Sequence, residues 1–155
     1  MRMLVGVDGS SFSDEALDEV SQRPWPADTE ILVVHAFDPP LAATPEGWAL
    51  PQTYYENLDR LATERAETTI KEAVDRLQVK VGNHVKVTGK AIFGSPKRVI
   101  LDEAEDWNAD LIVVGSHGYS VWGRLLLGSV SQAVVSHAHC SVEVVRRKHG
   151  EQAAA

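Results

Sequence analysis

The stretch that decides the fold reads Val114-Gly115-Ser116-His117-Gly118-Tyr119-Ser120-Val121-Trp122-Gly123-Arg124-Leu125-Leu126-Leu127-Gly128-Ser129. It leaves an apolar run typical of a buried strand and ends where a helical pattern begins. Gly115 and Gly118 predict a backbone that turns tightly and approaches a ligand with no Cβ in the way. Gly128 and Ser129 open the helix, where free N–H groups and the positive dipole end suit a phosphate. The stretch therefore predicts a strand–loop–helix unit that binds an anion.

The glycine spacing separates this stretch from the common phosphate-binding motifs. Gly118 and Gly123 have the separation of the Walker pattern, but Arg124 and Leu125 follow where that pattern needs Lys and then Ser or Thr. The dinucleotide pattern Gly-x-Gly-x-x-Gly is absent after the first predicted strand. What remains is Gly-x2-Gly-x9-Gly-Ser, with its three glycines at a predicted strand–helix boundary.

On either side of this stretch, strand and helix patterns alternate along the chain. The strands predicted to be buried on both faces are the short apolar runs Leu4–Val7, Ile31–Val34, Leu111–Val114 and Val142–Val145. Val85 to Phe93 is interrupted by polar residues and predicts a less buried strand near a sheet edge. The predicted helices cover Ser13–Gln22 and Leu58–Leu77, begin at Ser95-Pro96 with Ser95 as N-cap, and begin at Ser129 in a capping box with Gln132. This alternation predicts an α/β fold, a single-domain parallel sheet of five strands with helices on both faces.

Length and loop composition suggest how the chain is organised. Its 155 residues suit one domain, which we expect at residues 1–147, with 148–155 as a disordered tail. The segment from Phe37 to Thr53 carries four prolines and is too long for an ordinary strand–helix loop. It could be a lid or partner surface, or a mobile surface excursion.

Composition excludes several classes of function. A net charge of −7 and a pI near 5.3 argue against a general role on nucleic acid. The single cysteine, Cys140, excludes a disulfide within the chain and a zinc–thiolate cluster. No apolar run is long enough to span a membrane, and the few apolar residues after Met1 are too short for a signal peptide. We therefore expect a cytoplasmic protein with no membrane partner.

The glycine residues Gly115-Ser116-His117-Gly118 and Gly128-Ser129 occur together with Val5–Ser10, Val34-His35-Ala36 and Ser141–Val145. In these residues the sequence closely resembles the universal stress protein family, in its ATP-binding branch. The resemblance implies an open sheet of strand order 3-2-1-4-5, Rossmann-like and similar to the adenine nucleotide alpha hydrolases, with a nucleotide at the switch point between strands one and four. The general rule for open α/β sheets puts ligands at the same place.

The resemblance also implies roles for particular residues. Asp8 and the backbone around Ala36 would hold the adenosine part, although Ala36 stands where the family often has Val. The glycine loop and the helix start would cradle the phosphates of ATP, or of AMP or ADP, with Mg²⁺ or Mn²⁺ on the phosphates and no metal site of protein ligands. The predicted site residues are Val7, Asp8, Ala36, Val114, Gly115, His117, Gly118, Arg124, Gly128, Ser129, Val130 and Ser131.

Several of these residues have a second interpretation. Asp8 could cap the first helix or satisfy loop amides. His117 could transfer a proton, but with no partner base or nucleophile visible it is better read as a residue that shapes the turn. Arg124 could neutralise phosphate charge or lie solvated on a loop. His137 and His139 have a metal-like spacing that usually belongs to structural or exposed histidines.

The leading functional hypothesis is an ATP-binding stress-response or signalling protein. One alternative is a slow ATP hydrolase, which would have to work without a Walker lysine or an acidic metal pair. Another is an interaction module with a vestigial nucleotide pocket. The resemblance further implies a homodimer formed through the last strand, with Val142, Val144 and Val145 at the contact.

Overall fold

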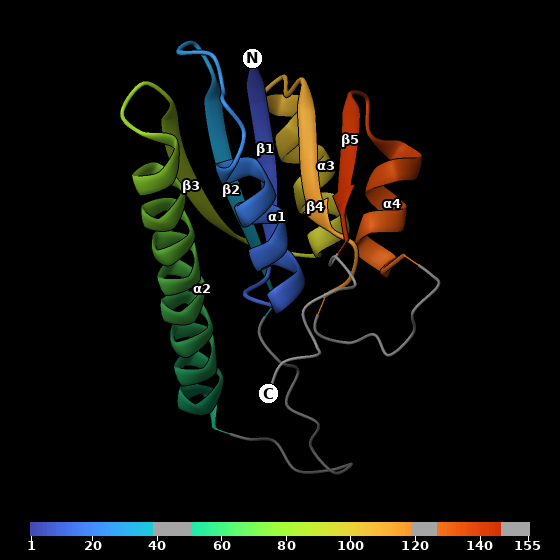
Figure 1. Cartoon of the computed structure of the whole chain (residues 1–155). Helices are drawn as coiled ribbons and strands as arrows, with labels where there is room; N and C mark the ends of the chain where they lie inside the picture. Colours follow the sequence, from blue (N-terminus) through green and yellow to red (C-terminus); the bar gives the residue numbers. More distant parts are fainter. Residues whose placement is uncertain (39–50, 119–126, 147–155) are drawn as a thin grey trace, which may run out of the picture.

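The computed structural model describes residues 1–38, 51–118 and 127–146. Within these residues, strands and helices alternate from one end of the chain to the other (Figure 1). Their bounds are β1 (Arg2–Val7), α1 (Ser11–Ser21), β2 (Glu30–Phe37), α2 (Gln52–Val81), β3 (Lys86–Phe93), α3 (Pro96–Asp106), β4 (Leu111–Gly115), α4 (Ser129–His137) and β5 (Ser141–Val145).

The five strands form one parallel sheet in the order β3-β2-β1-β4-β5, which confirms the predicted fold class and strand order. β1 lies at the centre, where Gly6 pairs with Val34 of β2 on one side and with Val114 of β4 on the other. The chain builds outward from β1 in one direction through β2 and β3, and in the other through β4 and β5. The switch point therefore lies at the carboxyl ends of β1 and β4.

Helices cover both faces of the sheet (Figure 1). On the face of α1 and α2, alternate β1 residues such as Met3 and Val5 pack with Leu17 and Leu77. On the face of α3 and α4, the intervening Leu4 packs in a second cluster with helix residues that include Ile100 and Val134. Successive strand side chains point to opposite faces, so a central strand buried on both sides has to be a continuous apolar run.

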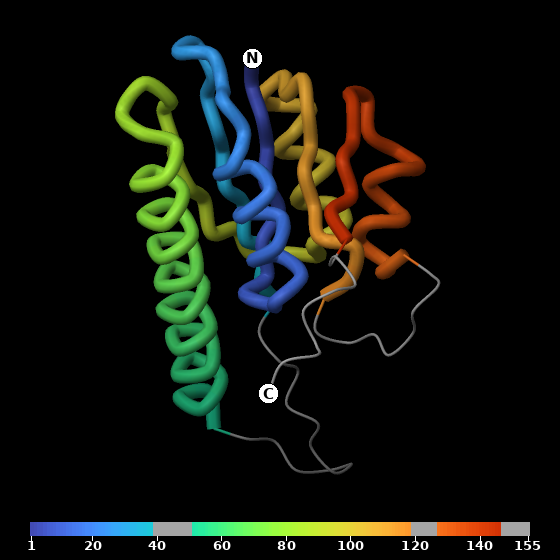
Figure 2. Tube along the Cα trace, in the orientation of Figure 1, coloured from blue at the N-terminus to red at the C-terminus, as the bar shows by residue number. Residues whose placement is uncertain are grey.

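Helix α2 is longer than its apolar periodicity predicts. Its buried residues start only at Ala66, yet the helix begins at Gln52 (Figure 2). The first turns extend beyond the carboxyl ends of the strands, where no sheet lies beneath them to select apolar side chains. A helix continued from a well-packed segment adds one hydrogen bond per residue at little cost, so its end need not carry a hydrophobic signal.

Of the two predicted helix starts, the one at Ser95-Pro96 is confirmed. Ser95 is the N-cap of α3 and Pro96 follows in the first turn, although the Ser95 side chain makes no capping bond. The capping box at Ser129 is wrong, because Gly128 is the N-cap of α4 and its carbonyl accepts the Gln132 amide at 2.9 Å. Ser129 is thus the first helical residue, one position too late to cap.

Several further predictions from the sequence can be compared with the structure only in part, because they extend beyond the described residues. β3 lies at the sheet edge, as its interrupted pattern predicts. The long segment after β2 ends by Gln52, and most of it, positions 39–50, lies outside the described residues, as does the predicted tail at 148–155. Among the described helices, none has the length and apolarity that spanning a membrane requires.

Candidate functional site

The loop after β4 and the start of α4 come together at the carboxyl edge of the sheet. The Gly128 amide donates to the Ser116 carbonyl at 2.8 Å, and the Ser131 hydroxyl donates to the Gly115 carbonyl at 2.7 Å. The two halves of the glycine motif are therefore joined directly. The first amides of α4, at Ser129 and the following residues, have no partner within the helix and form its positive dipole end.

Two of the three motif glycines allow segments of backbone to pack closely together. A Cβ on Gly128 would lie 3.2 Å from His117 Cα and 3.3 Å from the Ser116 carbonyl oxygen, so glycine lets the α4 start close on the loop. A Cβ on Gly115 would lie only 2.6 Å from the Phe12 carbonyl oxygen. Gly115 thus allows close packing against the first turn of α1, which is a reason for glycine in addition to the predicted approach to a ligand. The backbone of Gly115 has no positive φ, so space and not chain reversal selects glycine there.

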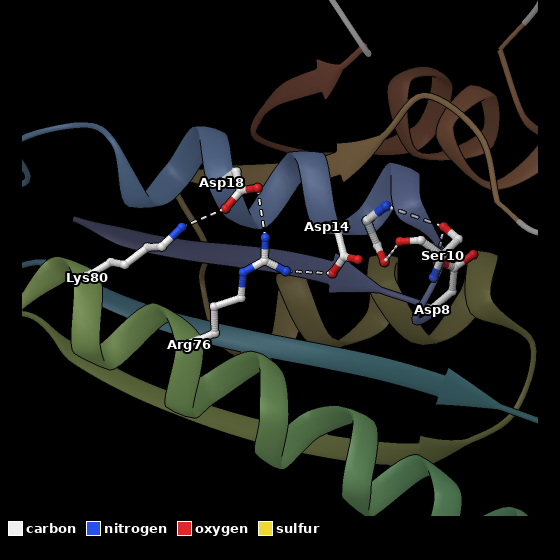
Figure 3. A network of polar contacts seen from close by, with 7 residues as sticks. Asp8, Ser10, Asp14, Asp18, Arg76 and Lys80 are labelled. Carbon is white, nitrogen blue, oxygen red and sulfur yellow. Dashed lines mark hydrogen bonds and ion pairs between the residues drawn. The ribbon is translucent and has the colours of Figure 1, made fainter. Parts of the chain in front are cut away.

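Asp8 follows β1 and lies between the glycine loop and the start of α1. Its Oδ1 accepts hydrogen bonds from the Ser10 amide at 3.0 Å and from the Ser10 hydroxyl at 2.5 Å (Figure 3). Ser10 is the N-cap of α1 and accepts the Ser13 amide at 3.3 Å. Asp8 Oδ2 lies 2.7 Å from where a Cβ on Gly118 would stand. One oxygen satisfies the local turn, as the second interpretation of Asp8 has it, while the other lies toward the loop.

A cavity of about 280 Å³ opens between these segments. Its walls come from the ends of β1, β2 and β4 and from the starts of α1, α3 and α4. The predicted residues that line it are Val7, Asp8, Ala36, Val114, Gly115, His117, Gly118, Gly128, Ser129, Val130 and Ser131. The structure thus brings every predicted site residue into one cavity except Arg124, which lies outside the described residues. Cavities near 300 Å³ are at the lower end of those that hold small molecules.

Four lining residues were not predicted from the sequence: Gly6, Ser13, Pro96 and Ile100. Ile100 Cδ1 lies 3.0 Å from where a Cβ on Gly6 would stand, so this glycine lets α3 approach the sheet beside the cavity. Pro96 marks the start of a helix in the sequence, but which helix start borders the switch point depends on the sheet order. Ser13 is buried and its hydroxyl donates to the Ser10 carbonyl at 2.9 Å, a role that its place in an ordinary helical pattern does not reveal.

Among the described lining residues, charged side chains are few. Asp8 is the one acidic residue among the described lining residues. His117 Nδ1 lies 3.1 Å from the Ser116 hydroxyl, its ring centroid is 5.3 Å from that of Phe12, and its buried Nε2 has no hydrogen-bond partner in the described part of the chain. The contacts of Nδ1 and of the ring are those of a residue that shapes the loop.

Metal ligands are not assembled among the described residues of this site. Across residues 1–38, 51–118 and 127–146, no group of three or more His, Cys, Asp or Glu side chains is placed to hold an ion. The metal-like pair His137 and His139 is exposed, and His137 Nδ1 lies 2.9 Å from the Ala133 carbonyl of its own helix. The described lining residues instead offer backbone amides, one carboxylate and apolar walls.

The family profile of the universal stress proteins matches residues 1–146 of the sequence. The chain belongs to the universal stress protein family. Over 151 residues it is 30% identical to the universal stress protein MJ0531 of Methanocaldococcus jannaschii, an alignment that covers 97% of this chain and 84% of that protein.

Solved universal stress proteins share the fold. The UspA structure from Lactobacillus plantarum superposes with a TM-score of 0.70 at 22% identity, covering 94% of this chain and 97% of that one. A family member from Arabidopsis thaliana with AMP bound gives a TM-score of 0.68 at 19% identity, covering 96% and 93%. A universal stress protein in complex with cAMP gives 0.66 at 22% identity, covering 94% and 96%. At these identities the likeness establishes the architecture of this universal stress protein.

Proposed function

We propose that this universal stress protein binds an adenine nucleotide in the cavity at the carboxyl ends of β1 and β4, with ATP as the leading candidate. The observation that carries the proposal is the hydrogen bond from the Gly128 amide to the Ser116 carbonyl. It brings the free amides of a helix start beside Asp8 and Ala36, so an anionic group and a polar ring system can be held in one cavity. Solved members of the family with AMP and with cAMP support an adenine ligand.

Each part of the nucleotide has a suitable partner. The amides at the start of α4 would donate to phosphate oxygens, and the oxygen of Asp8 that faces the loop would accept from ribose hydroxyls. The backbone at Ala36 would contact the adenine ring between the apolar side chains of Val7 and Ile100. Because Asp8 is the only acidic residue among the described lining residues, a Mg²⁺ or Mn²⁺ ion would be held mainly by the phosphates themselves.

The proposed role is stress response or signalling through nucleotide occupancy, within the cytoplasm that the sequence predicts. Rapid hydrolysis would need a positioned water and strong neutralisation of charge on the transferred phosphoryl group. The described lining residues supply no lysine, no arginine and no acidic pair for this purpose. Any hydrolysis would accordingly be slow.

The proposed assembly is a homodimer through β5, the strand at one edge of the sheet. The Ser116 amide donates to the Val145 carbonyl at 2.8 Å, so the backbone of Val145 faces β4. Because successive residues of a strand point their backbone groups in opposite directions, those of Val142 and Val144 face outward. Val145 is also buried, which leaves Val142 and Val144 as the residues able to pair with a second copy.

The proposal is tested by calorimetric titration of ATP into the wild-type chain and Gly128→Val. The added side chain would meet backbone atoms of His117 and Ser116 and push the α4 start away from the loop. Losing one charge-assisted hydrogen bond of about 1.5–3 kcal/mol should weaken binding by roughly 10-fold to 150-fold, and losing two should weaken it further. Ser136→Val, an exposed position on the same helix, is the matched control and should bind as the wild type does. Equal affinity of Gly128→Val and the wild type would rule out this site.

A further inference from the structure

β3 is an edge strand of the sheet, at the edge beside which α2 lies (Figure 1). The Lys86 amide donates to the Thr29 carbonyl at 3.3 Å, and the Gly94 amide donates to the Phe37 carbonyl at 2.9 Å. The even-numbered residues of β3 therefore direct their backbone groups toward β2. Since alternate residues of a strand point in opposite directions, the odd-numbered residues direct theirs away from the sheet.

One end of this free edge is closed by a side chain of α2. Gln78 accepts the Val87 amide at 3.4 Å through Oε1 and donates to the Val85 carbonyl at 3.1 Å through Nε2. These bonds satisfy the first outward groups of the strand. The outward amides and carbonyls of Gly89, Ala91 and Phe93 have no partner among the described residues.

The unpaired part of the edge is accessible. Phe93 is 65% exposed, although it is a large apolar residue. Gly89 is also exposed, even though Ile70 and Val74 of α2 lie directly over it, where an added Cβ would meet them at 2.5 Å and 2.8 Å. With that face covered, the exposed part of Gly89 is its backbone edge.

From this geometry we propose that a second copy of the chain pairs with β3, antiparallel and about a two-fold axis at Ala91. In that register Ala91 exchanges hydrogen bonds with Ala91 of the second copy, and Gly89 exchanges them with Phe93. All three free positions are used on both strands. A register moved one step toward Val87 would have to displace the Gln78 side chain, so the closed end of the edge fixes the alignment.

The side chains fit the same register. Phe93 would lie opposite Gly89 of the second copy, where an aromatic ring covers a position that lacks a side chain and meets the apolar Ile70 and Val74 above it. On the other face of the sheet, Lys90 would lie opposite Ile92 and not opposite its own copy, so the pairing places no like charges directly across from each other.

A second copy fits this edge better than an unrelated peptide because the edge complements itself. Symmetric pairing is the usual way in which identical chains associate, and here it satisfies the same three residues twice. This contact is separate from the nucleotide cavity and from β5. Together with a β5 contact, it would build assemblies larger than a dimer.

The first test measures the number of subunits by native mass spectrometry and analytical ultracentrifugation. Ala91→Pro removes the outward amide at the proposed axis without removing a bond to β2, because proline is tolerated where the N–H faces outward on an edge strand. Ala91→Ser keeps that amide and serves as the control. Val144→Pro is the matched change on the β5 edge. We expect Ala91→Pro to halve the subunit count of the wild type and Ala91→Ser to leave it unchanged. Val144→Pro, which changes only the β5 edge, should leave the β3 contact intact.

A circular dichroism spectrum establishes whether Ala91→Pro is folded. If the variant is folded and assembles like Ala91→Ser, the proposal is wrong. The proposal also fails if only Val144→Pro lowers the subunit count.

A second test does not depend on how the proline variant folds. In a Cys140→Ser background, Lys90→Cys and Ile92→Cys chains are prepared separately, mixed and oxidised mildly. Residues 90 and 92 of opposite copies would form a non-hydrogen-bonded pair with Cα atoms about 4.5 Å apart, within the range of a disulfide. We expect the mixture to give disulfide-linked dimers at least 10-fold faster than either chain alone. Equal or absent cross-linking in the mixture would overturn the proposed register.

Discussion

Asp8 holds Ser10 through two hydrogen bonds to a single carboxylate oxygen, from the Ser10 amide at 3.0 Å and the Ser10 hydroxyl at 2.5 Å. Ser10 in turn caps α1. The residue at the end of β1 thus fixes the start of the first helix while its second oxygen lies toward the glycine loop. A local structural role and a ligand contact are combined in one side chain, and two substitutions can separate them.

Asp8→Asn should keep an acceptor for Ser10 and remove the negative charge. We expect the free energy of unfolding to change by less than about 1 kcal/mol, whereas Asp8→Ala should lower it by about 1–2 kcal/mol through the loss of the turn and cap bonds. Both variants should bind ATP at least 10-fold more weakly. Thermal denaturation and calorimetric titration measure the two effects. Wild-type affinity in both variants would leave Asp8 with a structural role alone.

The two glycines of the loop should respond differently to alanine. At Gly115 the new Cβ would stand 2.6 Å from the carbonyl oxygen and 2.7 Å from the carbonyl carbon of Phe12, and these backbone atoms cannot move without displacing α1. We expect Gly115→Ala to cost about 1–3 kcal/mol in the free energy of unfolding. Chemical denaturation of the variant and the wild type measures that cost. A variant as stable as the wild type would show that α1 can move to make room for the new Cβ.

Gly118→Ala is the contrasting change. Its Cβ would meet the end of the Asp8 side chain at 2.7 Å, and a side chain can rotate away. We expect a loss of stability no larger than the roughly 1–2 kcal/mol of Asp8→Ala, together with a clear loss of nucleotide affinity as Asp8 is displaced. A variant that is strongly destabilised but binds ATP normally would contradict this interpretation of the loop.

The extent to which the sequence predicts this structure follows from how each feature is encoded. The strands are predictable because a strand buried on both faces must be continuously apolar, as Leu4–Val7 and Leu111–Val114 are. The ends of α2 are not, because its first turns lie past the strands and carry no apolar periodicity. Cavity walls from α3, at Pro96 and Ile100, could be found only once the sheet order placed that helix beside β1.

The role of Gly115 shows a different limit. Its spacing within the motif is visible in the sequence, but the same glycine serves a ligand approach or a close helix contact equally well. Only the position of Phe12, far earlier in the chain, reveals the close helix contact. Likewise, the one-residue error at the start of α4 arose because Gly128 and Ser129 are both acceptable N-caps, and the bond of Gly128 to Ser116 selects the glycine.

A network of charges that joins α1 to α2 should make stability depend on acid pH (Figure 3). Lys80 lies 2.8 Å from Asp18, and Arg76 lies 2.7 Å from Asp18 and 2.8 Å from Asp14. The hydrogen bond from Lys80, followed by that from Arg76, holds the pKa of Asp18 below its usual value despite partial burial.

Because the folded-state pKa of Asp18 is depressed, its contribution is present above the unfolded pKa, near 3.9, and is lost as the pH falls through the folded pKa. These side chains are partly exposed, so we expect Asp18→Asn to cost only about 0.5–1 kcal/mol at pH 7 and less in high salt. The difference between variant and wild type should shrink below about pH 4. Urea denaturation at several pH values measures it, and a difference that grows toward low pH would contradict the assignment.

A second charged contact ties the end of α1 to the edge strand β5. The Arg23 guanidinium forms a forked pair with Glu143, with N–O distances of 2.8 Å and 2.6 Å, and also lies 2.8 Å from Glu19. Glu143, followed by Glu19, raises the pKa of Arg23 above its ordinary value.

Lysine carries the same charge as arginine but cannot donate two parallel hydrogen bonds to one carboxylate. Arg23→Lys should therefore cost about 1 kcal/mol, at the upper end for a partly exposed pair. In a double-mutant cycle with Glu143→Gln, the Arg23→Lys change should cost little once the carboxylate is gone, whereas additive effects would show that the fork does not couple α1 to β5.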